Sequence, residues 1–264
     1  MAGSKARIIA VVNEKGGVGK TVTVINLGAG LSLKGKDVLI VDMDPQFNAT
    51  KGVGVSPGED TPSVYDVIKV PEPVPARSAI CKTAWQHLDL LPSHVDLSGV
   101  EVELVDEPGR ENRLKEALTP VSDLYDFILV DTPPSLSILT VNVLAFAQEI
   151  LIPCQTHPYA YGALDELLET VSIIKEEINP HIRIMGVLAT FFDQRTRVSN
   201  KVLESLKADK RFADKLFDTI IRVNTTIAES AYYGKPVIFF RRSSTGAADY
   251  LSLTEEILTL YRGR

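Results

Sequence analysis

The fold can be worked out from one glycine-rich segment, Lys15-Gly16-Gly17-Val18-Gly19-Lys20-Thr21. It stands between a mostly apolar run at 7–13 and apolar residues at helical spacing over 20–34. Its glycines let successive backbone N–H groups turn toward one anion, where a Cβ atom would block the approach. The following helix points its positive end at the same place. This pattern is typical of a phosphate-binding loop, in which Lys20 supplies charge to the β- and γ-phosphates and the Thr21 hydroxyl coordinates Mg²⁺.

The loop departs from the common form of this motif. The pattern G-x-x-x-x-G-K-[ST], aligned on Gly19-Lys20-Thr21, requires a glycine where this chain has Glu14. A second lysine, Lys15, instead stands five residues before Lys20. Its ammonium group has two possible targets, the nucleotide of its own loop or a nucleotide bound by a second subunit. The plain alternative is a solvated lysine beside a loop.

Two further stretches extend the pattern. KGGVGKT is followed by VLIVDMDPQFNAT at 38–50 and by FILVDTPPS at 127–135. Together these residues resemble the ParA/Soj/MinD group of deviant Walker ATPases, and most closely its ParA/Soj branch. The resemblance covers most of the chain and ends in Ala228-Glu229-Ser230 and in Gly234-Lys235-Pro236-Val237.

The resemblance implies an activity and its partners. We expect a weak ATPase that uses ATP and Mg²⁺, and that forms a sandwich homodimer when ATP binds, with Lys15 crossing to the partner's nucleotide. The dimer would bind double-stranded DNA without sequence preference. A ParB-like protein would stimulate hydrolysis and release, so that a chromosome or plasmid is segregated. The expected location is cytoplasmic and nucleoid-associated.

Three aspartates follow apolar strands, at the edge of a parallel sheet where ligands bind. Asp131 ends the strand at 127–130 and is expected to hold Mg²⁺ directly or through water. Its alternative is to cap the next helix. Asp42 and Asp44 are two residues apart, so on an extended segment both would face the metal. The resemblance implies that Asp44 positions the attacking water, while the alternative is a turn aspartate fixed by Pro45.

The resemblance also implies contacts for the rest of the nucleotide and for DNA. The predicted catalytic residues are Lys15, Lys20 and Asp44, and the predicted metal site contains Thr21, Asp42, Asp44 and Asp131. The predicted nucleotide-binding residues are Lys15, Gly16, Gly17, Val18, Gly19, Lys20, Thr21 and Val22, with Thr190, Arg222 and Asn224 near adenine. The predicted DNA-binding residues are Arg195, Arg197, Lys201, Arg222, Arg241 and Arg242. Four positions differ from the family pattern: Val22 replaces a threonine, Phe47 a glycine, His157 a glutamate and Thr226 a second DNA-binding arginine.

The charge distribution agrees with a local DNA-binding face. The chain has a net charge of −6, so any contact with DNA must come from a patch of bases. Residues 95–126 hold nine acids and three bases, whereas residues 193–222 hold eight bases and five acids. The second segment is therefore the candidate DNA face. Contacts of this kind reach phosphates, carry no sequence information and weaken with salt.

Length and pattern predict the fold. We expect 264 residues with 45% hydrophobic content to form a single P-loop ATPase domain over 1–264, without a separate N-terminal DNA-binding domain. Apolar strands alternating with amphipathic helices predict an α/β fold, a doubly wound, mostly parallel sheet flanked by helices. The predicted strands are 7–13, 37–42, 127–130, 150–152, 184–189 and 216–221, and the predicted helices are 20–34, 63–69, 137–147, 160–178, 197–208 and 246–261.

Three other functions use related machinery. A MinD-like membrane-positioning ATPase would need a terminal amphipathic helix with a basic face, but Glu255 and Glu256 fall in the last helical segment. We therefore expect no stable membrane insertion. A relative of the nitrogenase iron protein would need cysteines that bridge a cluster, and Cys81 and Cys154 do not follow that pattern. A ParA-like ATPase that positions a non-DNA cargo remains an alternative.

Overall fold

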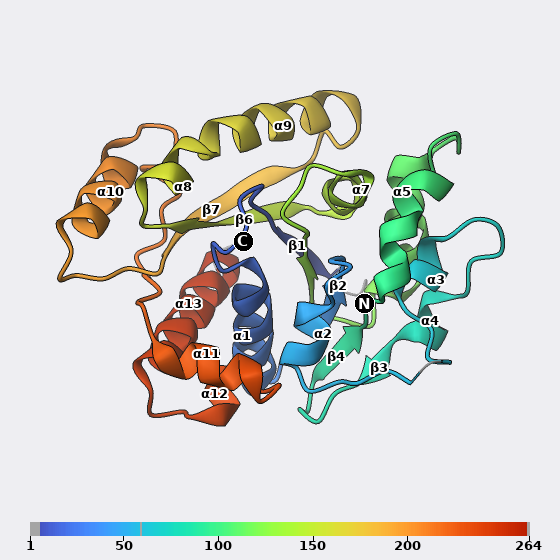
Figure 1. Ribbon diagram of the computed structural model, residues 1–264, viewed down its shortest axis with the longest axis horizontal. Helices are drawn as coiled ribbons and strands as arrows, with labels where there is room; N and C mark the ends of the chain where they lie inside the picture. Colours follow the sequence, from blue (N-terminus) through green and yellow to red (C-terminus); the bar gives the residue numbers. More distant parts are fainter. Residues whose placement is uncertain (1–5, 59, 263–264) are drawn as a thin grey trace.

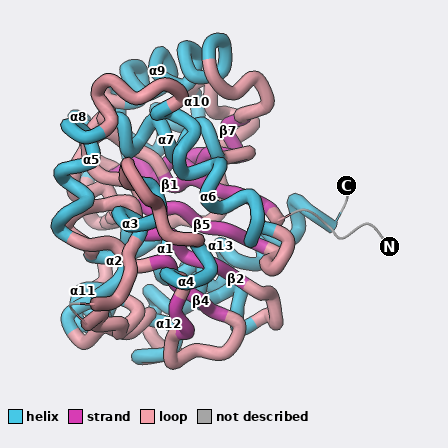
Figure 2. Tube along the Cα trace, turned by 90° about the vertical axis from the view of Figure 1, so that its right-hand side faces the viewer, coloured by secondary structure: helices cyan, strands magenta, loops and turns pink. Residues whose placement is uncertain are grey.

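A seven-stranded sheet runs through the computed structural model, which describes residues 6–58 and 60–262. The strand order is β3-β4-β2-β5-β1-β6-β7. Every neighbouring pair from β4 through β2, β5, β1 and β6 to β7 is parallel, and β3 joins β4 antiparallel at one edge. Figure 2 shows the strands stacked through the middle of the molecule. The strands are β1 (Arg7–Val11), β2 (Val38–Asp42), β3 (Cys81–Lys82), β4 (Leu88–Leu91), β5 (Phe127–Asp131), β6 (Glu149–Gln155) and β7 (Arg183–Thr190).

Helices cover both faces of the sheet (Figure 1). The helices and 3₁₀ turns are α1 (Lys20–Leu33), α2 (Asn48–Gly52), α3 (Val64–Ile68), α4 (Ala76–Ala79), η1 (Val95–Gly99), α5 (Val100–Glu103), η2 (Arg110–Asn112), α6 (Arg113–Ser122), α7 (Ile138–Phe146), α8 (Pro158–Gly162), α9 (Leu164–Glu177), α10 (Arg197–Ala208), α11 (Thr225–Tyr232), α12 (Val237–Phe240) and α13 (Thr245–Arg262). One core lies under α1, α12 and α13, and the other lies under α3, α6, α7 and α9. Burial on both faces explains the continuous apolar strands. The predicted α/β fold is confirmed.

The helix α13 packs closely against α1, as Figure 1 shows. Tyr250, Leu253 and Ile257 on α13 are fully buried in the core that this pair shares. The last helix is thus a packed element of the core. Within the described residues no helix has both the length and the apolar character that a membrane crossing requires.

The contact between α1 and α13 leaves no room for a side chain at Gly30. A Cβ atom built there would lie 2.1 Å from Thr254 Oγ1 and 3.1 Å from Thr254 Cβ. We expect Gly30→Ala to lower the free energy of unfolding by about 1–3 kcal/mol, because overpacking displaces the helices. Urea denaturation measures the loss. Gly162→Ala, where a Cβ meets nothing within 4 Å, is the control. In a Thr254→Ala background, Gly30→Ala should lower the free energy of unfolding by less, because the crowding atom is gone. An equal loss in both backgrounds would contradict this explanation.

The predicted strand at 216–221 is wrong as a regular strand. Leu216 forms an isolated parallel bridge with Val187 of β7, and Phe217 N–H donates to the Val187 carbonyl at 3.0 Å. The pairing is then interrupted, because Asp218 and Thr219 donate their backbone N–H groups to the Glu256 carboxylate of α13 instead. It resumes at Ile221, whose N–H donates to the Ala189 carbonyl of β7 at 2.9 Å. The segment therefore lies along β7 without forming a continuous ladder.

Other differences concern element boundaries and elements that the sequence did not predict, such as α6 and α11. The predicted helix at 160–178 is two helices, α8 beginning at Pro158 and α9 beginning at Leu164. The strand β4 was not predicted from the sequence, although it pairs in parallel with β2 from Val38↔Leu88 to Val41↔Leu91. Its four residues alternate little and contain Asp89, whose carboxylate is satisfied by Lys82 and Tyr125. These contacts of Asp89 form only when the chain folds, so the sequence around β4 does not predict them.

Candidate functional site

The glycine loop joins β1 to α1, and two of its glycines need the left-handed region. Gly17 has φ +74° and Gly19 has φ +96°, conformations that L side chains rarely adopt. At Gly19 a Cβ would also lie 3.3 Å from the Phe191 ring. Val18 between them is buried, and its carbonyl accepts a hydrogen bond from the Thr190 hydroxyl at 2.8 Å. The end of β7 therefore braces the loop.

Lys20 lies inside this loop. Its ammonium group donates to the carbonyls of Asn13 at 2.8 Å and Lys15 at 3.1 Å, and the residue is only 7% exposed. Burial lowers the pKa of Lys20, while the nearby Asp131 and Asp44 act in the opposite direction. No ion pair joins Lys20 to a carboxylate in the described chain. Its charge is thus held in place by carbonyl groups alone.

Asp131 ends β5 next to the loop. Both of its carboxylate oxygens are buried and accept no hydrogen bond from the described residues. Burial raises the pKa of Asp131 well above its ordinary value, the charge of Asp42 adds to this, and the nearby Thr21 hydroxyl acts in the opposite direction. The helix-cap alternative is wrong, because α7 is capped by Ser137. A buried carboxylate without donors, close to a hydroxyl, suits a hard cation such as Mg²⁺.

Asp42 and Asp44 do not play equivalent parts. Asp42 is fully buried and accepts hydrogen bonds from the Thr50 N–H and hydroxyl, both at 2.7 Å, and from the Asp44 N–H at 3.2 Å. Burial raises the pKa of Asp42 to about 6, although the bonds from Thr50 oppose the shift. Asp44 accepts the Gln46 N–H at 2.9 Å and lines the cavity beside the loop. Asp42 therefore anchors α2, and Asp44 faces the cavity.

Two adjoining cavities follow the loop. One of about 380 Å³ is lined by Gly16, Gly17, Lys20, Thr21, Asp44 and Pro134 among others. The second, about 150 Å³ and mostly apolar, is lined by Thr190, Arg222 and Asn224, together with Ile227 and Tyr250. Gly19, Val22 and Phe191 border both cavities. The residues predicted for adenine therefore do come together, next to the phosphate loop.

Phe191 borders both cavities and was not predicted from the sequence as a site residue. Phe191 is 39% exposed and has φ +50°, an uncommon conformation for a bulky residue that often marks a functional site. The signal available in the sequence was its position directly after the predicted Thr190. Asn224 and Arg222 also have structural partners: Asn224 caps α11 through Thr226, and the Arg222 guanidinium pairs with Asp249.

Lys15 is the loop residue that points elsewhere. Its backbone N–H donates to the Asn13 side chain at 2.9 Å, while its ammonium group lies 5.7 Å from the centre of the exposed Tyr159 ring. Within the described chain this ammonium group makes no hydrogen bond or ion pair with another side chain, and Lys15 does not line the loop cavity. The side chain therefore lies outside its own phosphate site.

The predicted DNA-binding residues form two exposed groups. Arg195, 82% exposed in its side chain, binds both oxygens of Asp193 at 2.9 Å and lowers the pKa of Asp193 to about 2. Arg197 and Lys201 follow on α10. Arg241 and Arg242 come after α12, where Arg241 lies 3.6 Å from Glu229. Thr226, which stands where the resemblance implies a second DNA-binding arginine, is 8% exposed and lies in the first turn of α11.

Among the described residues, no three His, Cys, Asp or Glu side chains form an all-protein metal site. Mg²⁺ does not need one, because it is commonly held by one or two protein oxygens together with phosphates and waters. Asp131, Thr21 and Asp44 fit that mode of binding. The geometry thus indicates a nucleotide-phosphate site with a metal held partly by the ligand.

Comparisons with known proteins agree with this geometry. The sequence matches the AAA domain family over residues 6–184. It is 42% identical over 251 residues to the sporulation initiation inhibitor protein Soj of Bacillus subtilis (strain 168), covering 95% of this chain and 98% of Soj. It is 37% identical over 266 residues to the chromosome partitioning protein ParA of Caulobacter vibrioides (strain NA1000 / CB15N), covering 100% and 98%.

A solved structure with a bound nucleotide has the same fold. The fold superposes with a TM-score of 0.84 on cobyrinic acid a,c-diamide synthase from Mycobacterium smegmatis with bound ADP and magnesium, at 32% identity over 98% of this chain and 97% of that one. The family match, the full-length relatives and the fold therefore agree on a nucleotide-binding domain. The chain belongs to the ParA/Soj family of chromosome-partitioning P-loop ATPases.

Proposed function

We propose that this chain is a DNA-partitioning ATPase whose ATP-bound form is a homodimer, with each Lys15 binding the nucleotide of the partner. The observation that carries the proposal is the position of Lys15, whose ammonium group lies over Tyr159 and outside its own phosphate cavity. A lysine with no carboxylate partner at this position suits a negative charge brought by another molecule. Binding energy from ATP then stabilises the dimer, and hydrolysis removes it.

The residues of each site have separate tasks. The loop from Gly16 to Thr21 surrounds the phosphates with N–H groups, and Lys20 adds a fixed charge. Thr21, Asp131 and Asp44 would hold Mg²⁺, with Asp42 supporting them through α2. When bound, Mg²⁺ neutralises charge on the phosphate oxygens. Asp44, which faces the cavity, orients the attacking water.

The base would occupy the apolar cavity next to the phosphates. Val22 and Phe191 border both cavities, so a single nucleotide reaches from one to the other. Thr190, Arg222 and Asn224 supply polar atoms around this cavity. Phosphoryl transfer needs mostly positioning and charge neutralisation. A slow ATPase that waits for a basic segment from a ParB-like partner is therefore consistent with the site.

The ATP-bound dimer would bind double-stranded DNA through exposed basic side chains of the protein, which gives a nucleoid-associated location. Arg195, Arg197 and Lys201 lie at the start of α10, and Arg241 and Arg242 lie after α12. The remaining predicted residue, Arg222, is held by Asp249 and is the weakest candidate. Membrane binding has no support in α13, whose apolar side is buried in the core.

Arg195→Glu is expected to weaken DNA binding about tenfold or more, because it replaces one phosphate contact with a repulsive charge and frees Asp193. The measurement is a DNA-binding titration with ATP at several salt concentrations, in which the salt dependence should also become shallower. Lys175→Glu on α9 is the control, since it changes the same charge away from both groups. ATP-dependent dimerisation should be unchanged. Equal DNA affinity in both variants would move the DNA face away from α10.

A further inference from the structure

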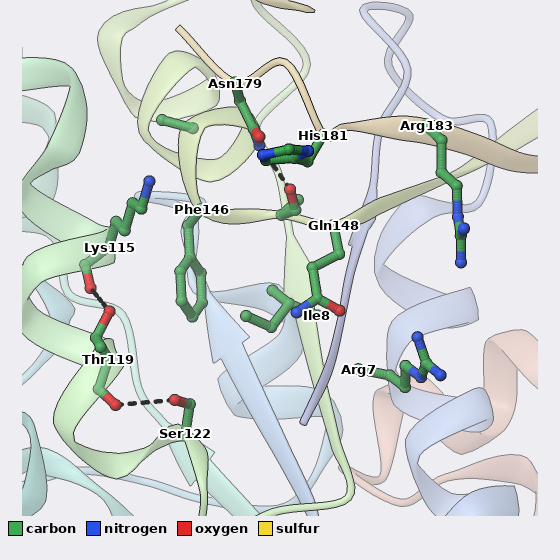
Figure 3. Close-up of a pocket in the computed structure, with 12 residues that line it drawn as sticks. Arg7, Ile8, Lys115, Thr119, Ser122, Phe146, Gln148, Asn179, His181 and Arg183 are labelled. Carbon is green, nitrogen blue, oxygen red and sulfur yellow. Dashed lines mark hydrogen bonds between the residues drawn. The ribbon is translucent and has the colours of Figure 1, made fainter. Parts of the chain in front are cut away.

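A separate cavity of about 570 Å³ opens at the opposite end of the sheet from the phosphate loop. It is bordered by Arg7 and Arg183, the first residues of β1 and β7, and by residues of α6 and α7. Figure 3 shows Arg7 and Arg183 on one side, Lys115 on the opposite side, and Phe146 and Gln148 between them. The volume falls in the range of small-molecule sites, about 300–1,000 Å³.

The charges around this cavity are mostly of one sign. Lys115 and His181 have no ion pair with the described residues, and Arg7 stacks over the Tyr261 ring at 4.8 Å without a carboxylate partner there. Arg183 pairs with Glu149 at 2.8 Å. Glu149 is 4% exposed and also accepts the Tyr261 hydroxyl. Three permanent cations and a histidine therefore line the cavity, and the buried Glu149 pairs with only one of them, Arg183, in a chain that is acidic as a whole.

The floor of the cavity is apolar. Phe146 and Ile8 line it, and both are largely buried in the adjoining core. The Asn179 amide group, which also lines it, is fixed by two hydrogen bonds to the carbonyls of Leu144 and Ala147. The cavity thus combines a fixed apolar floor with bases that approach from two sides. That combination favours a ligand with an apolar body and at least two negative charges.

We propose that this cavity is a binding site for a small organic phosphate, distinct from the ATP site. The phosphate would lie between Lys115 and the Arg7–Arg183 side, and the organic part would rest on Phe146. A cleft lined by one sign of charge with apolar walls concentrates ions of the opposite sign. None of its lining residues belongs to the phosphate loop or to the two cavities beside it. The proposal therefore does not depend on the ATPase mechanism.

The test is a calorimetric titration of phenyl phosphate into the full chain saturated with ADP and Mg²⁺, so that the phosphate loop is filled. We expect saturable binding that weakens at least about tenfold in Lys115→Gln, because a charge-assisted contact is lost. Lys115 is exposed, so this variant should fold normally. His181→Gln is a second variant on another wall of the cavity. Lys175→Gln on α9 is the matched control and should bind as the wild type does.

Three comparisons identify the ligand class. Phenyl phosphate should bind more tightly than inorganic phosphate, because only the former covers the apolar floor. It should also bind more tightly than benzoate, which carries one charge. Binding should persist in Lys20→Ala, where the phosphate loop is disabled. Absence of saturable binding, an unchanged affinity in both Lys115→Gln and His181→Gln, a preference for benzoate, or loss of binding in Lys20→Ala would each overturn the proposal.

Discussion

Lys20→Ala is expected to weaken ATP binding by about 10- to 150-fold or more, the equivalent of one charge-assisted hydrogen bond worth about 1.5–3 kcal/mol. The reason is that folding has already placed this ammonium group. It is 7% exposed and bound only to the Asn13 and Lys15 carbonyls, so it meets the phosphates without further desolvation or ordering. Isothermal titration calorimetry with ATP and Mg²⁺ measures the change.

The control for this prediction is a lysine far from the loop. Lys175→Ala, on the exposed side of α9, should leave the ATP affinity unchanged. The melting temperature of Lys20→Ala without nucleotide shows whether the loop still folds. An ATP affinity within twofold of wild type in a folded Lys20→Ala protein would mean that the loop from Gly16 to Thr21 is not the phosphate site.

Asp44→Ala is expected to retain ATP and to lose turnover by about 100-fold or more, the range for a group that positions or deprotonates the nucleophile. One oxygen of Asp44 accepts the Gln46 N–H, and the other has no hydrogen bond within the described chain, so it is available to a water. Phosphate release measured at saturating ATP gives the turnover. Asp123→Ala, an exposed aspartate beyond α6, is the matched control.

The variant Asp44→Asn distinguishes the two possible roles of Asp44, orienting a water and shaping the turn before α2. Asparagine keeps the bond to Gln46 N–H and removes only the charge. If the charge orients the water, Asp44→Asn should be nearly as slow as Asp44→Ala. If Asp44 only shapes the turn before α2, Asp44→Asn should turn over ATP at the wild-type rate, and Asp44 would have no part in the mechanism.

Asp42→Ala should instead lower the free energy of unfolding, because Thr50 would lose its buried acceptor.

The phosphate loop and the central strands could be predicted because each depends on residues close in the sequence. Glycine at 17 and 19 is required by local backbone conformation, and apolar runs such as 38–42 are required by burial on both faces. Asp42 and Asp44 have different hydrogen-bond partners for a local reason too. The strand β2 ends at Asp42, so the alternation of side chains no longer applies two residues later.

The rest depends on contacts between distant parts of the chain. Phe191 borders the site because β7 ends beside the loop, and the irregular segment at 216–221 follows from Glu256 of α13. The basic cavity is built from positions 7, 115, 181 and 183, which form no motif in the sequence. The backbone at Phe47 was also not predictable from the sequence. Its φ of +46° is a conformation that glycine adopts easily, which agrees with the glycine that the resemblance implies at this position, but a phenylalanine does not indicate such a conformation.

The central claim is that ATP holds two copies together through Lys15, and the oligomeric state tests it most directly. Light scattering after size-exclusion chromatography should show a dimer of the 28.9 kDa chain with a nonhydrolysable ATP analogue and Mg²⁺, and a monomer with ADP. Lys15→Ala should bind the analogue and stay monomeric. A wild-type chain that remains monomeric when saturated with the analogue, or a Lys15→Ala protein that dimerises as well as the wild type, would contradict the account.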